Sequence, residues 1–372
     1  MNFIPVNKPL ITKADIDKVN KTLKSGWISS SGKEIVAFEK NFSKYVNHKF
    51  GIAVANGSAA LDIAIKLANL KKNDEIIIPN FTIISNALPG IKQGLKIKVV
   101  DCDMYDWNLN IEKLKKTITK KTKVIIATHI YNYPCRVDII KRICDQKNIL
   151  LIEDCAEAIG QKIFSKKCGS FGHISVFSFY ANKQITTGEG GMITTNSKLF
   201  EKKARSLRNL SFGVKNRFNH TDVAWNYRLT NIQASLGLSQ LQRVNTIIKK
   251  RHRVGKLYYE KLKSNKNIFM PSPKNKFSQN IYWVIAILIL NKDLKIDNIK
   301  AAKKLRKFGI ETRPFFWPMH KQKVLKNYNF YNSDKYKNSD YISKYGFYLP
   351  SSLNLTVSEI SYVCKKVNQI FK

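Results

Sequence analysis

The strongest constraint on this chain is the alternation of short apolar segments with amphipathic segments through its first half. Residues 58–70 and 137–148 carry apolar side chains at helical spacing. Seven other segments have the dense, apolar composition of buried strands, namely residues 51–56, 75–79, 96–103, 123–131, 149–154, 174–179 and 190–195. Apolar strands that alternate with helices predict an α/β fold, with a mostly parallel sheet covered by helices on both faces.

Beyond about residue 240 the pattern changes. Residues 241–264 predict one long amphipathic helix, residues 281–290 a buried strand, and residues 298–310 a further helix. We place a domain boundary inside the long helix, which gives a large domain over residues 1–245 and a smaller α+β domain over residues 246–372. The first 20 or so residues are candidates for packing on the smaller domain.

The charge balance is strongly basic, with 65 Lys and Arg against 26 Asp and Glu and a net charge of +39. Such a balance can serve a nucleic acid or an anionic membrane. Here the charge is spread along the whole chain and is mostly lysine, whereas nucleic-acid sites concentrate arginine with exposed aromatic side chains. We therefore expect neither a nucleic-acid nor a membrane partner, although a basic surface could attract a doubly charged sugar nucleotide.

The remaining composition favours a cytoplasmic protein. The start of the chain, MNFIPVNKPL, lacks the pattern of a signal peptide, and the apolar run 281–290 is too short to span a bilayer. The six cysteines show neither CxxC spacing nor a zinc-site pattern, so we expect reduced thiols and no metal.

Residues whose side chains could take part in catalysis or binding follow several of the predicted strands. Asp154 ends one strand, Ser178 closes another and leads to Lys183, and Gly57-Ser58 begin a helix directly after a third strand. Taken singly, such residues are usually caps, turns or solvated side chains. Because the carboxyl ends of parallel strands meet at one edge of a sheet, we expect these residues to share one site.

Their chemistry fits pyridoxal 5'-phosphate. A lysine amine can condense with the aldehyde of this cofactor, and the Asp154 carboxylate can pair with the protonated ring nitrogen and keep the ring electron-withdrawing. Backbone N–H groups at a helix N-terminus, together with Ser58, can hold the phosphate. Phe81, just after the strand 75–79, could cover one face of the ring.

Several stretches in chain order resemble one family. They are GWISSSGKEIVAFE (26–39), ANGSAALDIA (55–64), PNFTIISNA (79–87), EDCAEAIG (153–160), FSFYANKQITTGEGGM (177–192), WNYRLTNIQASLGLSQL (225–241) and GIETRPFFWPMH (309–320). On these residues the chain resembles the DegT-type sugar-nucleotide aminotransferases. This resemblance implies fold type I of the pyridoxal-phosphate-dependent transferases, the fold of aspartate aminotransferase.

The resemblance also implies roles for individual residues. Lys183 would bind the cofactor covalently, Asp154 would pair with its ring nitrogen, and Glu157 would bind its ring hydroxyl. The positions that fall on the phosphate site are Gly57, Ser58, Ala59 and Ser178. Asn226 would reach the phosphate of a neighbouring subunit's cofactor, which implies a homodimer with active sites at its interface.

Within the family, the stretches SGWISSSGK, DWNLN, THIYNYPCRVD, FNHTDVAWNYR and ETRPFFWPMH look like those of the GDP-perosamine synthases. These enzymes transfer an amino group from L-glutamate to C4 of GDP-4-keto-6-deoxymannose. Candidate substrate contacts are Arg313, His320 and His220. Asn132 and Arg136 depart from the family pattern; we expect Asn132 to tolerate a left-handed turn and Arg136 to lie near the site and alter substrate choice.

Three alternatives remain open at this point. The substrate could be a UDP- or dTDP-linked 4-keto-6-deoxyhexose. A dehydratase is disfavoured because such relatives carry histidine where this chain has Lys183. A non-catalytic regulator or polyanion-binding protein on this fold is disfavoured because Lys183 and Asp154 are both present.

Overall fold

An eight-stranded sheet forms the centre of the larger part of the molecule in the computed structural model, which describes residues 3–328, 330, 331 and 335–372. Only β9 runs against its neighbours among the described strands of this sheet, so the predicted mostly parallel α/β fold is confirmed. In spatial order the strands are β1 (Phe50–Val54), β9 (Gly191–Thr195), β8 (Ile174–Ser178), β5 (Leu150–Asp154), β4 (Thr122–Thr128), β2 (Glu75–Pro79), β3 (Lys96–Val100) and β13 (Phe330–Tyr331).

The sheet is buried on both faces because successive side chains of each strand point to opposite sides. Ile76 and Ile126 pack on the face covered by α3 (Gly57–Leu67) and α7 (Lys198–Arg208). Ile77 and Ile125, one residue along, pack on the opposite face. That face is covered by three helices, α2 (Lys33–Tyr45), α6 (Val137–Gln146) and α8 (Asn231–Gln242).

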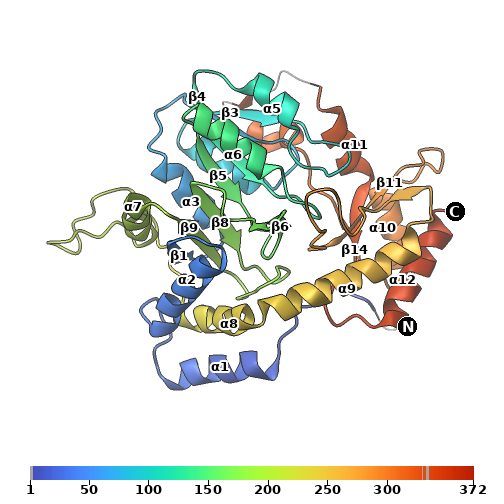
Figure 1. Cartoon of the computed structure of the whole chain (residues 1–372), viewed down its shortest axis with the longest axis horizontal. Helices are drawn as coiled ribbons and strands as arrows, with labels where there is room; N and C mark the ends of the chain where they lie inside the picture. Colours follow the sequence, from blue (N-terminus) through green and yellow to red (C-terminus); the bar gives the residue numbers. More distant parts are fainter. Residues whose placement is uncertain (1–2, 329, 332–334) are drawn as a thin grey trace.

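The C-terminal part has its own hydrophobic core around a second, antiparallel sheet. Its strands, in spatial order, are β10 (Ile268–Phe269), β11 (Ile285–Ile289), β14 (Gly346–Leu349) and β12 (Arg313–Pro314). The helices around it are α9 (Val244–Leu262), α10 (Asn298–Arg306), α11 (Lys337–Tyr345) and α12 (Val357–Ile370). Figure 1 shows α9 running from the large sheet to this second part, so α9 links the two cores.

The N-terminal residues contact both parts of the molecule. Ile4 forms a parallel bridge with Ile310 of the C-terminal part. By contrast, α1 (Lys13–Lys24) lies against α8, where Asp15 accepts a hydrogen bond from Ser239 at 2.7 Å and pairs with Arg243. The boundary near residue 245 stays a prediction.

Two predicted elements differ from the structure. The helix predicted over residues 241–264 is interrupted at Arg243, which separates α8 from α9 and whose side chain is held by Asp15 and by the Leu10 carbonyl. The predicted strand 281–290 is confined to β11, and Tyr282, before it, has a positive φ of 49°. Tertiary anchoring of these residues outweighs the local apolar pattern.

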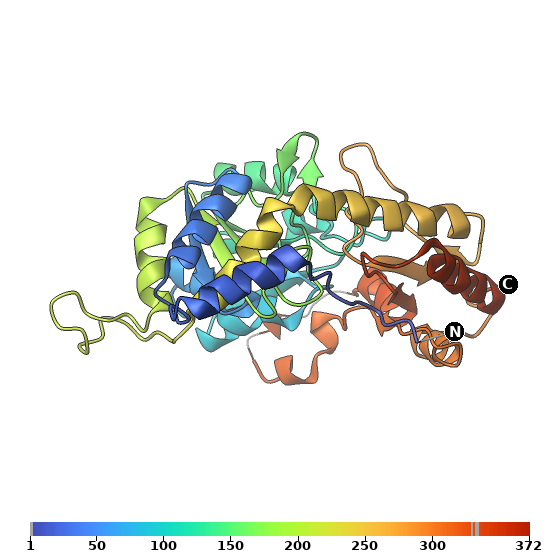
Figure 2. The same ribbon diagram turned by 90° about the horizontal axis from the view of Figure 1, so that it is seen from below.

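The remaining elements are short. They are α4 (Leu88–Lys92), α5 (Ile111–Thr117), β6 (Lys162–Ile163), β7 (Lys166–Lys167), and the 3₁₀ helices η1 (Ile84–Asn86), η2 (Met319–Lys321) and η3 (Lys323–Leu325). Between α7 and α8 a long loop projects far from the body of the molecule, as Figures 1 and 2 both show. Within the described residues we find no helix with the length and apolar character needed to cross a membrane.

Candidate active site

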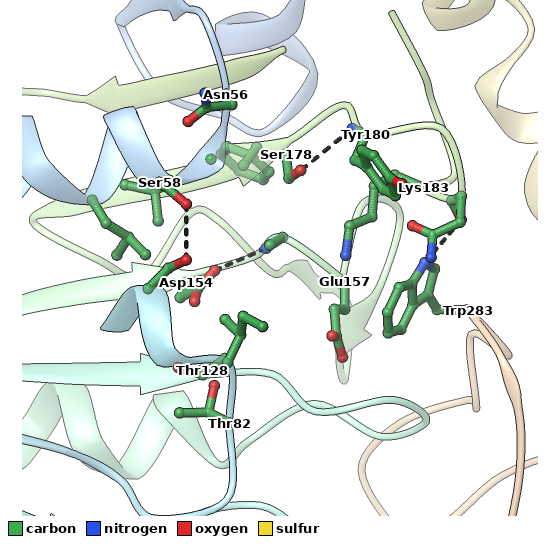
Figure 3. A pocket seen from close by; sticks show the side chains of 18 of the residues that line it. Asn56, Ser58, Thr82, Thr128, Asp154, Glu157, Ser178, Tyr180, Lys183 and Trp283 are labelled. Atoms are coloured by element: carbon green, nitrogen blue, oxygen red, sulfur yellow. Dashed lines mark hydrogen bonds between the residues drawn. The ribbon is translucent and has the colours of Figure 1, made fainter. Parts of the chain in front are cut away.

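A cavity of about 490 Å³ lies at the carboxyl edge of the parallel strands, between the large sheet and the C-terminal part. It brings together six of the residues singled out in the sequence, which are Gly57, Ser58, Asp154, Glu157, Ser178 and Lys183. Figure 3 shows Lys183, Glu157 and Trp283 grouped at one side, with Asp154 and Ser58 across from them. Five of them, all except Glu157, were expected to share one site because they follow the carboxyl ends of strands, and they do line one cavity.

Asp154 ends β5 and is only 1% exposed. Its Oδ2 accepts a hydrogen bond from the Asn86 side chain at 3.0 Å, and its Oδ1 accepts one from the Ala156 N–H at 3.1 Å. Thr128 in turn donates to Asn86 Oδ1 at 3.1 Å, which fixes the orientation of the Asn86 amide. Burial nevertheless raises the pKa of Asp154, because these two hydrogen bonds do not fully replace its hydration. A cationic partner would stabilise this carboxylate.

Lys183 lies directly against an aromatic ring. Its Nζ is 3.8 Å from the centroid of the Trp283 ring, and its backbone N–H donates to the Tyr180 carbonyl at 2.9 Å. Burial lowers the pKa of Lys183, while the charges of Glu157 and Asp154 oppose that change. A lysine whose pKa is lowered in this way is more readily available as a neutral nucleophile or a base near neutral pH.

A second set of contacts fixes the backbone beside this lysine. The Trp283 indole N–H donates to the Asn182 carbonyl at 3.0 Å. Arg251, which is 4% exposed, donates to the Trp283 carbonyl at 2.8 Å and also to the Asn182 carbonyl at 3.5 Å. Residues from α9 and from the C-terminal part thus set the position of Lys183.

Glu157 is also buried, and its Oε2 accepts a hydrogen bond from the Tyr131 N–H at 2.8 Å. Burial raises the pKa of Glu157, whereas the charge of Lys183 acts in the opposite direction. A carboxyl group with a raised pKa can supply a hydrogen-bond donor at a pH where ordinary glutamates cannot.

The start of α3 presents backbone donors to the cavity, which suits an anion. Asn56 caps the helix by accepting a hydrogen bond from the Ala59 N–H at 2.8 Å, so the Ala59 N–H is already engaged. The N–H groups at Gly57 and Ser58 lie in the first turn, where backbone donors lack intrahelical acceptors and the helix dipole favours negative charge. A Cβ added at Gly57 would lie 3.1 Å from Ser178 Cβ, so glycine allows the close approach of these two segments.

These features fit pyridoxal phosphate. The cavity contains an amine, a buried carboxylate that no ion pair among the described residues neutralises, and a helix N-terminus with the Ser58 and Ser178 hydroxyls. An aldehyde, a protonated ring nitrogen and a phosphate are the complementary groups.

Phe81 does not line this cavity. It is fully buried and its ring packs with those of Tyr131, Phe315 and Phe316. The residue of that stretch that faces the cavity and is exposed is Ile83, at 44%. The geometry therefore gives no support to the expectation that Phe81 covers a ring.

The candidate substrate contacts from the C-terminal part also lie outside the lining. Arg313 is exposed on β12 and is paired in register with Tyr348, which does line the cavity. His320 is engaged elsewhere, since its Nδ1 contacts the Asn80 side chain at 2.9 Å and its Nε2 lies 3.1 Å from Asp340. Arg313 is thus paired with a residue of the cavity, whereas the side chain of His320 contacts Asn80 and Asp340, which lie outside the lining.

His220 and Asn226 lie in the loop that projects between α7 and α8, and neither lines the cavity of its own chain. The His220 Nδ1 contacts the Leu210 carbonyl at 2.7 Å, and Asn226 is exposed and bridges to Asn209. Within one chain, neither residue therefore lines this cavity.

Asn132 and Arg136, the two residues that depart from the family pattern, do not have the positions expected of them. The positive φ of 56° occurs at Tyr131, not at Asn132, which is buried with an amide that has no hydrogen-bond partner within the described residues. Arg136 makes two hydrogen bonds with Asp138, at 2.8 and 2.9 Å, and is absent from the cavity lining. Arg136 is thus paired with Asp138 and does not line the cavity, so the geometry gives no support to a substrate contact.

Four residues that line or support the cavity were not identified from the sequence, namely Asn86, Thr128, Trp283 and Tyr348. Asn86 and Thr128 were detectable in principle, because Thr128 ends an apolar strand and Asn86 follows another closely. Trp283 and Tyr348 come from the C-terminal part and reach the cavity only through tertiary packing. No local signal connects them with Lys183.

A buried cluster of His129, Glu153 and Cys168 has the spacing of a possible metal site. The polar atoms of Glu153 and His129 are already engaged, however. Glu153 accepts hydrogen bonds from three backbone N–H groups and contacts His129 Nε2 at 3.1 Å, while His129 Nδ1 accepts from the Cys135 N–H. We regard this cluster as structural, because its hydrogen bonds hold β5 against the segments around His129 and residues 169–172.

Comparisons with known proteins match nearly the whole chain to one family. The DegT/DnrJ/EryC1/StrS aminotransferase family matches residues 9–368. The GDP-perosamine synthase of Escherichia coli O157:H7 is 33% identical, over 100% of this chain and 99% of that protein. The GDP-perosamine synthase of Caulobacter vibrioides is 36% identical, over 99% and 98%. A solved structure, the PLP form of the putative sugar aminotransferase Spr1654 from Streptococcus pneumoniae, has a TM-score of 0.91 at 24% identity and covers 99% of this chain and 98% of that one.

Proposed function

The chain belongs to the DegT/DnrJ/EryC1/StrS aminotransferase family, and we propose that it transfers an amino group from L-glutamate to C4 of GDP-4-keto-6-deoxy-D-mannose, forming GDP-perosamine. It is a pyridoxal-phosphate-dependent enzyme that acts on a nucleotide-linked sugar. Full-length identity of 33% to 36% with GDP-perosamine synthases supports the choice of substrate. The observation that carries the chemistry is one cavity containing Lys183, Asp154 and the start of α3.

Each residue of the cavity has a proposed task. Pyridoxal 5'-phosphate, when bound, supplies an electron sink for the carbon that loses a proton. Lys183 would hold the aldehyde carbon of the cofactor and would carry a proton as base and then as acid. Asp154 would keep the ring nitrogen protonated, and Glu157 would bind the ring hydroxyl. The proposed phosphate residues are Gly57, Ser58, Ala59 and Ser178; the Ala59 N–H already donates to Asn56, so Ala59 would add only to the field of the helix N-terminus.

We further propose that a second copy completes each site. The projecting loop exposes several apolar side chains, with Val214 fully exposed, and a monomer would leave them in water. Asn226 and His220 lie on this loop and do not line the cavity of their own chain, so docking of the loop on a partner is the proposed way for them to reach the partner's cofactor and substrate.

The experiment compares three 4-keto-6-deoxyhexoses, linked to GDP, UDP and dTDP, with glutamate as donor. We expect kcat/KM for the GDP sugar to be about a hundredfold higher, which corresponds to about 2.7 kcal/mol and needs only one or two lost base-edge hydrogen bonds. Equal or better turnover of the UDP or dTDP sugar would replace the proposed substrate while leaving the aminotransferase chemistry in place.

Arg313 gives a residue-level test of the same proposal. Because Arg313 is exposed and adjoins Tyr348 at the cavity, Arg313→Ala should raise KM for the sugar nucleotide more than for glutamate. The matched control is Arg253→Ala, an exposed arginine of α9 outside the lining, which should change neither KM. Equal effects on both substrates would remove Arg313 from the substrate site.

A further inference from the structure

A second cavity, of about 710 Å³, lies on another part of the molecule and shares no lining residue with the catalytic cavity. Three segments enclose it: the β6–β7 hairpin, the first half of α9, and the loop over residues 274–279. Its size falls within the range typical of ligand pockets, about 300–1,000 Å³.

The charge around this cavity has one sign. Five lysines line it, from all three segments, together with His252, and the described lining contains no aspartate or glutamate. The lysines are Lys162, Lys167, Lys249, Lys274 and Lys276. In the described part of the chain none of the five forms an ion pair, although many other lysines of this protein do.

The arrangement concentrates positive charge that the described residues leave uncompensated. Lys167 is directed to the Tyr45 carbonyl at 2.6 Å, and both burial and the charge of Lys162 lower the pKa of Lys167. Burial also lowers the pKa of His252. A multiply charged anion would relieve this repulsion, as phosphate groups do with clustered lysines.

Other groups of the cavity suit a nucleoside rather than a bare phosphate. Phe164, at the turn of the hairpin, is 67% exposed and holds a positive φ of 52°, a strained conformation for an aromatic residue that its backbone bond to Phe277 helps to maintain. An exposed ring beside basic groups offers a stacking surface for a base.

An unused acceptor points the same way. Gln161 is 2% exposed, and its side-chain N–H₂ donates to Ser278 and to the Gln279 carbonyl, both at 2.6 Å. Its Oε1 is buried without a hydrogen-bond partner among residues 3–328, 330, 331 and 335–372. A hydrogen-bond donor would satisfy this oxygen, and ribose hydroxyls and base amino groups carry such donors.

We propose that this lysine-lined cavity is a second binding site, for a nucleoside diphosphate, separate from the catalytic cavity. The diphosphate lies among the lysines of the three segments, and the base lies against Phe164. Because the hairpin, α9 and the loop 274–279 come from both parts of the molecule, the bound nucleotide ties these parts together.

The test counts bound GDP per chain on the holoenzyme by equilibrium dialysis. Lys162→Ala combined with Lys249→Ala should weaken one site about a hundredfold or more. At a GDP concentration about ten times the wild-type Kd of this site, about one equivalent is then lost relative to the wild type, while kcat/KM of amino transfer is unchanged. The control, Lys303→Ala with Lys304→Ala on α10, removes two exposed lysines away from the cavity and should lose none. The loss of one equivalent is expected whether or not the catalytic cavity also binds GDP.

Identical stoichiometry in the wild type and in the Lys162/Lys249 variant would overturn the proposal. A second arm uses inorganic pyrophosphate as a competitor and Phe164→Ala as the variant. We expect pyrophosphate to compete at least about tenfold less well than GDP, and Phe164→Ala to weaken only GDP. Equal competition by pyrophosphate would overturn the assignment to a nucleotide.

Discussion

Replacing Asp154 by asparagine should abolish most of the activity without lowering stability. In the wild type the Asp154 carboxylate is buried, and burial raises its pKa. For an acid whose folded-state pKa is raised, the ionised form costs stability as the pH rises above the unfolded value, near 3.9. The cofactor-free protein at neutral pH therefore gains stability when this charge is removed.

The hydrogen bonds around Asp154 can adapt to an amide. If the introduced amide presents its N–H₂ group toward Asn86, the Asn86 amide can turn over, because the Thr128 hydroxyl can either donate or accept. We expect a net change of at most about 1 kcal/mol in the stability of the cofactor-free protein. The rate of the half-reaction with glutamate, by contrast, should fall by about 10² to 10⁴, or about 2.7–5.5 kcal/mol, because the ring nitrogen loses its anionic partner.

Asp101 provides a matched control, since it also follows a parallel strand and is 2% exposed, but lies outside the cavity. Its pKa is lowered despite burial, because Lys113 at 2.8 Å and Ser339 at 2.5 Å hydrogen-bond to the carboxylate. Its stabilising effect is thus present above the unfolded pKa and is lost as the pH falls through the folded pKa. These partners of Asp101 are donors, so Asp101→Asn should cost about 2–4 kcal/mol.

The assays are thermal unfolding of the cofactor-free proteins and stopped-flow absorbance of the half-reaction with glutamate. Asp154→Asn should be slow but stable, whereas Asp101→Asn should be less stable but, when folded, active. A rate for Asp154→Asn within about fivefold of the wild type, or a greater loss of stability than for Asp101→Asn, would refute this reasoning.

Three further predictions concern the lysine and the assembly. Lys183→Ala should abolish transamination with the fold intact, and borohydride should attach the cofactor only to a wild-type peptide that contains Lys183; labelling of another lysine contradicts the assignment. Lys183→Ala and Asn226→Ala, each inactive, should regain part of the activity when mixed and allowed to exchange subunits, because some hybrid sites then carry both residues; a fully active monomer in sedimentation would disprove this. Trp283→Leu removes the ring beside Lys183 Nζ, a contact worth about 0.5–2 kcal/mol, so Lys183 of the cofactor-free protein should react about 2- to 30-fold faster with an acylating reagent at neutral pH; unchanged reactivity would show that the ring does not stabilise the ammonium.

Much of the fold and part of the site could be predicted from local patterns. Strands such as β2 were placed to the residue, because a short apolar run bounded by polar residues has few alternatives. The helix break at Arg243 escaped prediction, since it depends on contacts with Asp15, more than two hundred residues away in sequence.

Side-chain direction after a strand was harder to predict. Phe81 and Ile83 both follow β2, yet only Ile83 faces the cavity, while Phe81 joins an aromatic cluster with residues of the C-terminal part. Beyond the end of a strand, no alternation of side chains fixes which residue faces the cavity. Packing with distant residues then decides the direction of each side chain.

By itself, the sequence determined which residues stand at strand ends, and parallel pairing then brings Asp154, Ser178 and Gly57 to one edge of the sheet. Only the tertiary structure decided how those residues behave. Trp283 and Arg251 reach Lys183 from the C-terminal part and from α9, and Asn86 orients Asp154. The pKa directions of Lys183 and Asp154 follow from burial, which depends on every surrounding element and is therefore not encoded in any local stretch of the chain.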